Sequence, residues 1–248
     1  MPRHSRQQSG SGIYHVIMRG INRQTIFEDE EDNNRLIETL KKYKDISSYR
    51  LFAYCLMGNH FHLLLKTEGE DLAQILKRVA GSYVYWYNLK YERSGHLFQD
   101  RFKSESVESD RYFLAVLRYI HQNPINAGLC SKSEEYDYSS YNDYISGRSK
   151  LLDIEYVFSI IDRDSFIEMN NEKIDDRCLE SEDLNIRIND HDAMAIIQSV
   201  SNCASATAFQ SLEIACRDVY LKELKTHGLS IRQISRLTGI SFSIVRRI

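Results

Sequence analysis

Three patterns that would assign the chain to a common class are missing from it. The 5 cysteines are scattered and odd in number, and none forms a C-x-x-C pair, which argues against a disulfide framework and against a zinc ribbon. No apolar run approaches the roughly 20 residues of a membrane span, and the polar N-terminus contains no apolar segment of a secretion signal. We therefore expect a soluble, cytoplasmic protein that has no membrane partner.

An excess of one charge is missing as well. The formal net charge is -3, so the sum over the chain predicts neither a nucleic acid nor a membrane as partner. Lysine and arginine nevertheless recur between residues 66 and 103, while acids crowd residues 153 to 192. The negative charges of an acidic segment can offset the positive charges of a basic binding surface elsewhere, so that the net charge does not reveal the basic surface. The 248 residues, 42% of them hydrophobic, suffice for a real core and for more than one domain.

Hydrophobic periodicity in residues 1–148 predicts alternating strands and helices. The order is strand, helix, strand, strand, helix, strand, helix. This order predicts an α+β fold in which helices pack on an antiparallel, ferredoxin-like sheet. The strands are expected over 12–19, over 49–57, from His60 onward and, as a strand or irregular sheet edge, over 96–107; the helices are expected over 31–46, over 71–91 and from Asp110 to Pro124.

Two histidines, His60 and His62, flank Phe61 in the third of these strands. Side chains alternate between the faces of a strand, so both imidazoles project from one face and Phe61 projects from the other. Two adjacent imidazoles on one sheet face are a ready pair of metal ligands. The alternative is a pair of partly buried histidines held by hydrogen bonds, and the three-residue pattern alone does not separate these two interpretations.

A second set of polar residues lies at the end of the helix that begins at Asp110. Tyr119 and Asn123 are four residues apart, so they are neighbours on one helical face. A phenol and an amide oxygen brought beside two histidines would provide a divalent-metal site with a phenolic nucleophile. The alternative is an ordinary core tyrosine at position 119, and Tyr112 is a competing candidate for the nucleophile.

Such a set of groups suits the cleavage of a phosphodiester. A neutral phenol, whose pKa is about 10, attacks poorly, and the phosphodiester must have its charge neutralised and its geometry fixed. A bound cation does both, as Lewis acid and as template. Mg²⁺ prefers oxygen ligands and Mn²⁺ tolerates imidazole better, so either ion is a candidate cofactor.

Three separated blocks, in this order, carry a family resemblance: Asn59-His60-Phe61-His62-Leu-Leu-Leu, Gly95-His-Leu-Phe-Gln-Asp-Arg-Phe-Lys-Ser, and Arg118-Tyr119-Ile-His-Gln-Asn123-Pro-Ile-Asn-Ala-Gly128. From Gly12 to Tyr144 the chain resembles the single-tyrosine HUH transposases of bacterial insertion sequences, and in particular their REP-associated tyrosine transposase branch. The resemblance implies a nuclease domain over residues 1–148 that cleaves single-stranded hairpin DNA by tyrosine attack. The products would be a 5′-phosphotyrosine bond and a free 3′-hydroxyl.

The resemblance also implies roles for individual residues. His60 and His62 would be metal ligands, Tyr119 the nucleophile and Asn123 the third ligand, although other members carry glutamine at that turn. With one candidate tyrosine, strand transfer at two ends needs two protomers or sequential reuse of one tyrosine, so a monomer and a homodimer are both open. Contacts to the DNA backbone are expected from basic residues of the same domain, namely Arg19, Arg23, Arg78, Arg101 and Lys103.

The C-terminal part predicts a separate module. Residues 149–203 are acidic with weak periodicity, which indicates a linker with short helices. Residues 204–248 contain a helix, a second short helix, a Thr-Gly-Ile turn and a basic last helix, typical of a small all-α helix-turn-helix domain that binds duplex DNA. This segment resembles the DNA-binding end of replication-initiator proteins; a plain helical hairpin is the alternative. Its expected DNA contacts are Arg232, Arg236, Arg246 and Arg247.

Two other functions are open at this point. A retired transposase would act as a DNA-binding regulator, but the presence of all four candidate site residues favours an active enzyme. A different metal hydrolase built on His60 and His62 would need acidic ligands, for which Glu105 and Glu108 are the nearby candidates.

Overall fold

The structure is a computed structural model that describes residues 9–99, 101–172, 190–203, 205–227, 229 and 231–248. The chain folds into two compact units, Met1–Glu182 and Asp183–Ile248, and each unit has a hydrophobic core of its own. Within the described ranges, no helix combines the length and the apolar character needed to cross a lipid bilayer.

The first unit is organised around an antiparallel sheet of four strands in the order β2-β3-β1-β4. Strands β2 and β3 are joined through the tight turn at Gly58 and Asn59, and β1 lies between β3 and β4 in the sheet. This arrangement confirms the expected α+β, ferredoxin-like fold. The strands are β1 (Ile13–Arg19), β2 (Tyr49–Met57), β3 (His60–Thr67) and β4 (Lys103–Ser106).

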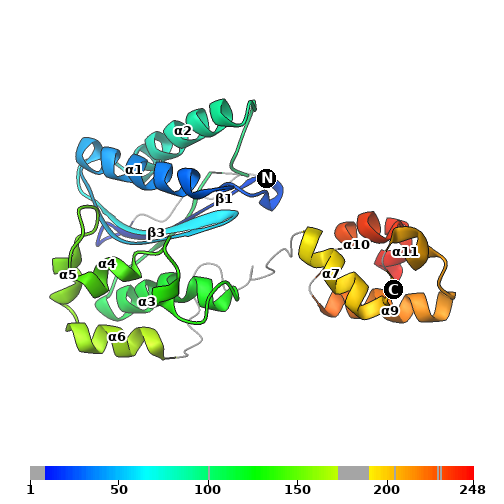
Figure 1. The fold of residues 1–248 in the computed structure, drawn as a ribbon. Helices are drawn as coiled ribbons and strands as arrows, with labels where there is room; N and C mark the ends of the chain where they lie inside the picture. The colour runs from blue at the N-terminus through cyan, green and yellow to red at the C-terminus, as the bar shows by residue number, and fades with distance from the viewer. Residues whose placement is uncertain (1–8, 100, 173–189, 204, 228, 230) are drawn as a thin grey trace. The chain divides into compact units, whose positions relative to one another are not determined.

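Helices cover both faces of this sheet (Figure 1). Helices α1 (Glu30–Ser47) and α2 (Leu72–Lys90) lie on one face, and α3 (Asp110–Asn126) lies on the other. Each begins at a side-chain cap, because the carboxylates of Asp29 and Asp71 and the hydroxyl of Ser109 accept hydrogen bonds from backbone N–H groups of the first turn. The ring of Phe61 is buried on the α1 and α2 face of the sheet, so His60 and His62 point toward α3.

Two element boundaries differ from the sequence-based expectation. Helix α3 passes Pro124 and ends at Asn126, because proline removes only its own N–H bond and the Ala127 N–H still bonds to the Asn123 carbonyl. The expected strand over 96–107 shrinks to β4. Before it, Phe98 forms an isolated bridge with Gly20, and the Gln99 N–H donates to the Arg19 carbonyl at 2.9 Å.

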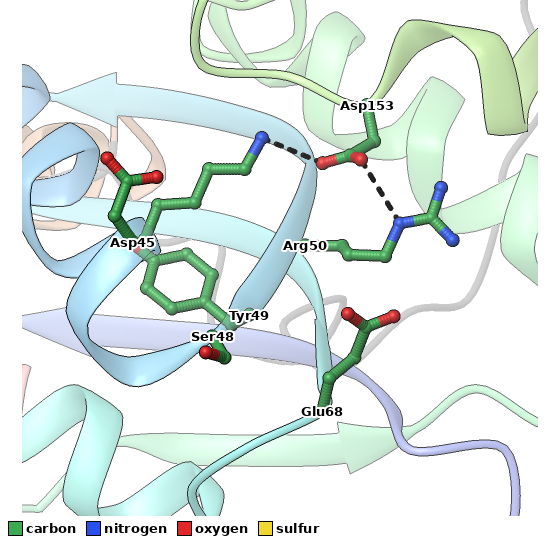
Figure 2. A pocket seen from close by; sticks show the side chains of 7 residues that line it. Asp45, Ser48, Tyr49, Arg50, Glu68 and Asp153 are labelled. Carbon is green, nitrogen blue, oxygen red and sulfur yellow. Dashed lines mark hydrogen bonds and ion pairs between the residues drawn. The ribbon is translucent and has the colours of Figure 1, made fainter.

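The expected linker over 149–203 is corrected in the part of it that is described. Residues 149–171 pack on the first unit, because Ile154, Val157 and Phe166 are buried in the same core as the sheet. Asp153 forms ion pairs with Lys44 at 2.9 Å and Arg50 at 3.1 Å (Figure 2). The helices here are too short for periodicity to reveal them. They are α5 (Ile154–Phe158) and α6 (Arg163–Asn171). The 3-10 turn η2 (Ser133–Glu135) and helix α4 (Tyr141–Ser146) precede this segment.

The second unit is helical. Its core includes Ala193 and Ile197 of the first helix, so residues 190–201 belong to this unit and not to a linker. A turn at Gly239, where φ is +71°, separates the last two helices. Residues 173–189 of the expected linker lie outside the described residues. The helices are α7 (Asp190–Ser201), α8 (Ala206–Gln210), α9 (Ile214–Thr226), α10 (Ile231–Thr238) and α11 (Phe242–Arg247).

Candidate active site

Strand β3 places His60 and His62 side by side on the face of the sheet that packs against α3. Their ring centroids are 5.1 Å apart with planes at 74°. His62 is fully buried, whereas His60 lies at the end of the strand and is partly exposed. The paired imidazoles therefore span the boundary between the core and the surface.

A third histidine joins this pair from the neighbouring strand. His15 of β1 is fully buried, and its Nε2 lies 3.1 Å from Nδ1 of His62. The two rings are stacked, with centroids 5.4 Å apart and planes at 22°. Sequence reasoning placed His15 in a strand but did not include it in the site, because its contact with His62 depends on which strands pair in the sheet.

Tyr119 of α3 lies against both buried histidines. Its ring centroid is 5.8 Å from that of His62 and 5.8 Å from that of His15, and both contacts are edge-on. The tyrosine is 5% exposed, so the phenol is enclosed with the imidazoles. The structure thus brings together the histidine pair and the candidate nucleophile, which are separated by more than 50 residues in the sequence.

The rival tyrosine, Tyr112, lies two helical turns earlier on α3. Its hydroxyl donates a hydrogen bond to the Oε1 atom of Glu105 on β4. Glu105 lies opposite His15 in the pairing of β4 with β1, and its Oε2 is 3.7 Å from Nδ1 of His15. Tyr112 therefore reaches the edge of the cluster through a carboxylate, whereas Tyr119 contacts the histidines themselves.

Of the two acids considered for a different metal hydrolase, Glu105 contacts His15 and Tyr112. Glu108 instead accepts hydrogen bonds from the backbone N–H groups of Gly10 and Ser11, both at 3.0 Å. Among the described residues, no three histidine, cysteine, aspartate or glutamate side chains form a group that could hold a metal ion. The structure gives no support to that alternative.

Burial keeps the histidines of the cluster neutral. It lowers the pKa of His60 to about 3, with smaller contributions from the positive charges of Arg19 and Arg23. Burial also lowers the pKa of His62 well below its usual value, and the neighbouring His60 and His15 lower it further. Neutral imidazoles keep a ring-nitrogen lone pair, which is the form that binds a cation.

The ring of His60 is also oriented. Its Nδ1 lies 2.6 Å from Oδ1 of Asn59, and because a carbonyl oxygen only accepts, Nδ1 carries the proton. The lone pair of His60 therefore sits on Nε2, as in metal-binding histidines whose other nitrogen is hydrogen-bonded. The donor chemistry of the pair fits a divalent cation of the Mn²⁺ type, which tolerates imidazole better than Mg²⁺ does.

Asn123 lies one helical turn after Tyr119, and it is buried. Its Nδ2 donates to the backbone carbonyl of Tyr119 at 3.3 Å. This bond ties the amide to the turn of α3 that carries the tyrosine. An amide oxygen at this place is a ligand type that hard cations accept.

Most of the basic residues expected in the first unit lie near the candidate site. Arg19 ends β1 and pairs with His60 in the sheet, and Arg23 ends the 3-10 turn η1 (Ile21–Arg23). Lys103 begins β4, opposite Ile17, and Arg101 is exposed just before it.

The structure does not bring Arg78 to the site. Its side chain forms a two-pronged ion pair with Glu70, at 3.0 and 2.7 Å. It is carried by α2, on the face of the sheet opposite the histidines. The sequence could not show which face of the sheet α2 would cover.

In the second unit, α10 and α11 carry the arginines expected to contact DNA. Arg236, Arg246 and Arg247 are exposed on these helices. The side chain of Arg232 lies outside the described residues.

An antiparallel ferredoxin-like sheet with a histidine pair beside a helical tyrosine is the arrangement that the resemblance to single-tyrosine HUH transposases implies. The family model described as "Transposase IS200 like" matches residues 9–123. These residues hold the whole sheet and all but the last turn of α3. Residues 9–123 therefore match the IS200-like transposase family, which confirms the family resemblance over this part of the chain.

The first unit shares its fold with a solved structure, and a second solved structure matches less well. A structure described as a REP-associated tyrosine transposase bound to a REP hairpin is 16% identical with a TM-score of 0.52, over 59% of this chain and 86% of that one. A structure described as a putative transposase from Deinococcus radiodurans R1 is 20% identical with a TM-score of 0.35, over 49% of this chain and 97% of that one. No curated protein matches the chain.

Proposed function

We propose that the first unit is a metal-dependent endonuclease and strand transferase for single-stranded DNA, in which Tyr119 is the nucleophile. The observation that supports this most is the edge-on contact of the Tyr119 ring with His62 and His15. His60, His62 and Asn123 would hold the divalent cation, Mg²⁺ or Mn²⁺. When bound, the cation would neutralise the phosphate charge and fix the position of the phosphate.

The proposed reaction exchanges one phosphodiester for another. The phenol of Tyr119 gives up its proton, and its oxygen forms a bond with phosphorus as the bond from phosphorus to the 3′ oxygen breaks. The 3′ oxygen takes up a proton and leaves as a free hydroxyl, while the 5′ end stays joined to the tyrosine. Attack by another 3′-hydroxyl on this phosphotyrosine would restore the phenol and join two strands.

We further infer that the substrate is a DNA hairpin. The fold matches that of the transposase described as bound to a REP hairpin. Arg19, Arg23, Arg101 and Lys103 lie at the end of β1, in η1 and at or just before the start of β4, where they would contact DNA phosphates. The same likeness supports membership of the REP-associated branch.

The second unit would bind duplex DNA as a helix-turn-helix. Gly239, with its positive φ, makes the turn that separates α10 from α11, and these helices carry the exposed arginines. In this proposal the second unit delivers the first to hairpins beside its duplex site.

The test is an adduct assay with a labelled single-stranded hairpin, with Mn²⁺, Mg²⁺ or EDTA. Wild type and Tyr112→Phe should form a covalent protein–DNA adduct with metal and none with EDTA. Tyr119→Phe should form none, because it lacks the attacking oxygen but keeps the ring contacts. The pair Tyr119→Phe and Tyr112→Phe is matched, since each removes one hydroxyl from the same helix.

Two results would contradict the proposal. An adduct in Tyr119→Phe that is lost in Tyr112→Phe would move the nucleophile to Tyr112. Tight hairpin binding with no adduct from wild type under either metal would favour a retired transposase that acts as a DNA-binding regulator.

A further inference from the structure

A chain of polar side chains runs from the edge of the sheet to His62. It begins at the Tyr112 hydroxyl, which donates to Glu105, continues from Glu105 to His15, and ends in the 3.1 Å contact of His15 Nε2 with His62 Nδ1. These groups come from α3, β4, β1 and β3, so the series of side-chain contacts crosses adjacent strands of the sheet. The nucleophilic reaction described above makes no direct use of Tyr112, Glu105 or His15.

The proton positions along this chain follow from the acceptors. A carboxylate only accepts, so the nitrogen of His15 that faces Glu105 at 3.7 Å, Nδ1, is the one favoured to carry the proton. A neutral imidazole has one proton, which leaves a lone pair on Nε2 of His15. The His62 Nδ1–H then donates to this lone pair, and the lone pair of His62 is placed on its Nε2.

We propose that Glu105 and His15 are positioning residues that fix the tautomer and ring orientation of His62, so that His62 presents Nε2 to the divalent cation. This inference rests on the proposed function of His62 as a metal ligand. Asn59 does the same for His60 through the 2.6 Å bond to Nδ1. Both histidines then present Nε2, each held by a different partner at Nδ1, as is usual for metal-binding histidines.

The packing supports a positioning role. His15 is fully buried and its ring lies nearly parallel to that of His62, so a rotation of the His62 ring would break the hydrogen bond between them. Tyr112 holds one oxygen of Glu105, which leaves the other oxygen directed toward His15. The side chain of Glu105 is 28% exposed, so its substitution disturbs the core less than that of His15.

The experiment compares wild type with Glu105→Gln and His15→Phe, and it uses Glu108→Gln as the matched control. Glu108 lies three residues from Glu105 and is exposed, and it binds backbone N–H groups instead of a histidine. The first measurement is ¹⁵N–¹H correlation NMR of the histidine rings in the metal-free protein, with the His62 signals assigned from His62→Gln. The second is Mn²⁺ affinity, from the electron paramagnetic resonance signal of the free ion.

Wild type and Glu108→Gln should show His62 as a single tautomer protonated at Nδ1. In Glu105→Gln and His15→Phe the Nε2-protonated form should appear, and Mn²⁺ should bind about 10- to 100-fold more weakly, the range found when partners of metal-binding histidines are removed. An unchanged His62 tautomer together with unchanged Mn²⁺ affinity in Glu105→Gln would overturn the inference, even if His15→Phe does not fold.

The measurements separate this inference from the proposed function. The NMR experiment needs neither metal nor DNA, so it tests the positioning of His62 whether or not the chain cleaves DNA. If wild type forms no adduct while Glu105→Gln changes the tautomer, the proposed cleavage fails and the positioning stands. In hairpin cleavage, Glu105→Gln should lower kcat at a fixed Mn²⁺ concentration and leave the KM for DNA unchanged, because Glu105 acts on a metal ligand.

Discussion

The Tyr119 ring stands edge-on to the imidazole of His62, with ring centroids 5.8 Å apart and planes at 78°. The tyrosine comes from α3 and the histidine from the central part of the sheet, so the contact is fixed by the packing of the helix on the sheet. The candidate nucleophile therefore keeps its place beside the histidine pair without help from any loop.

Removal of His62 should abolish cleavage. In His62→Gln we expect the rate of adduct formation to fall at least about 100-fold, because a ligand of the cation is lost from a buried site. His121→Gln is the matched control, since His121 is also a fully buried histidine of the first unit but bonds to Ser140 and Asn170. At a temperature where both variants are folded, equal losses in both would show that the effect is structural.

The role of Asn123 as third metal ligand can be tested with substitutions that keep or remove its side-chain oxygen. Asn123→Asp should keep Mn²⁺ binding, because it keeps an oxygen at that position, while Asn123→Leu should weaken Mn²⁺ binding at least about 10-fold. Isothermal titration calorimetry measures both. Equal Mn²⁺ affinities for Asn123→Leu and wild type would remove Asn123 from the ligand set.

Arg19 and Arg78 should differ in their effect on hairpin binding. Arg19 of β1 lies opposite His60 of β3 in the sheet, next to the candidate site. The Arg78 side chain instead donates two hydrogen bonds to Glu70. Arg19→Gln should reduce the slope of log affinity against log salt by about 0.7, the value for one phosphate contact to a single strand, and Arg78→Gln should leave it unchanged. Fluorescence anisotropy with a labelled hairpin at several salt concentrations gives both slopes.

Acid should destabilise the first unit through His121. Burial lowers the pKa of His121 in the folded state to about 3, so between that value and its unfolded pKa near 6.5 the unfolded state binds more protons. The contribution of the neutral His121 ring to the free energy of unfolding is fully present above about pH 6.5. Below that pH it falls by about 1.4 kcal/mol per pH unit. In urea titrations followed by the fluorescence of Trp86, wild type should lose about 2 kcal/mol more than His121→Gln between pH 7 and pH 5. Parallel losses in the two proteins would contradict this assignment.

The extension of the first unit beyond residue 148 is testable through Phe166. This ring is fully buried in α6, and its centroid lies 4.8 Å from that of Tyr144. Phe166→Ala should cost about 3–5 kcal/mol of stability. The single tryptophan, Trp86, belongs to the first unit and reports its unfolding. Phe209→Ala is a matched change in the core of the second unit. It should leave the midpoint of the unfolding transition reported by Trp86 fluorescence unchanged.

The parts of the fold and site that could be predicted from sequence are those that depend on local spacing. The alternation of His60, Phe61 and His62 fixes which side chains share a sheet face, and the four-residue step from Tyr119 to Asn123 fixes a helical face. His15 was missed because its contact with His62 joins residues 47 apart in the sequence and depends on strand pairing.

The errors at the end of the first unit have a different cause. Helices α5 and α6 span only 5 and 9 residues, too few for a clear helical period, and the longer segment from 153 to 192 is rich in acids. The apolar side chains of α5 and α6, Phe166 among them, nevertheless pack in the core of the first unit. The acidic composition therefore indicates a linker, although α5 and α6 are packed on the first unit.

The contacts of α6 with α3 have a mechanical consequence. Arg118 forms an ion pair with Glu172 at 3.6 Å, and Gln122 donates to the backbone carbonyls of Asn170 and Glu172 at 2.8 and 2.7 Å. These two residues flank Tyr119 on its own helix. The last described residues before position 173 are therefore bonded to the helix that carries the candidate nucleophile. Any force applied to Glu172 would thus act first on the helical turns that hold Tyr119.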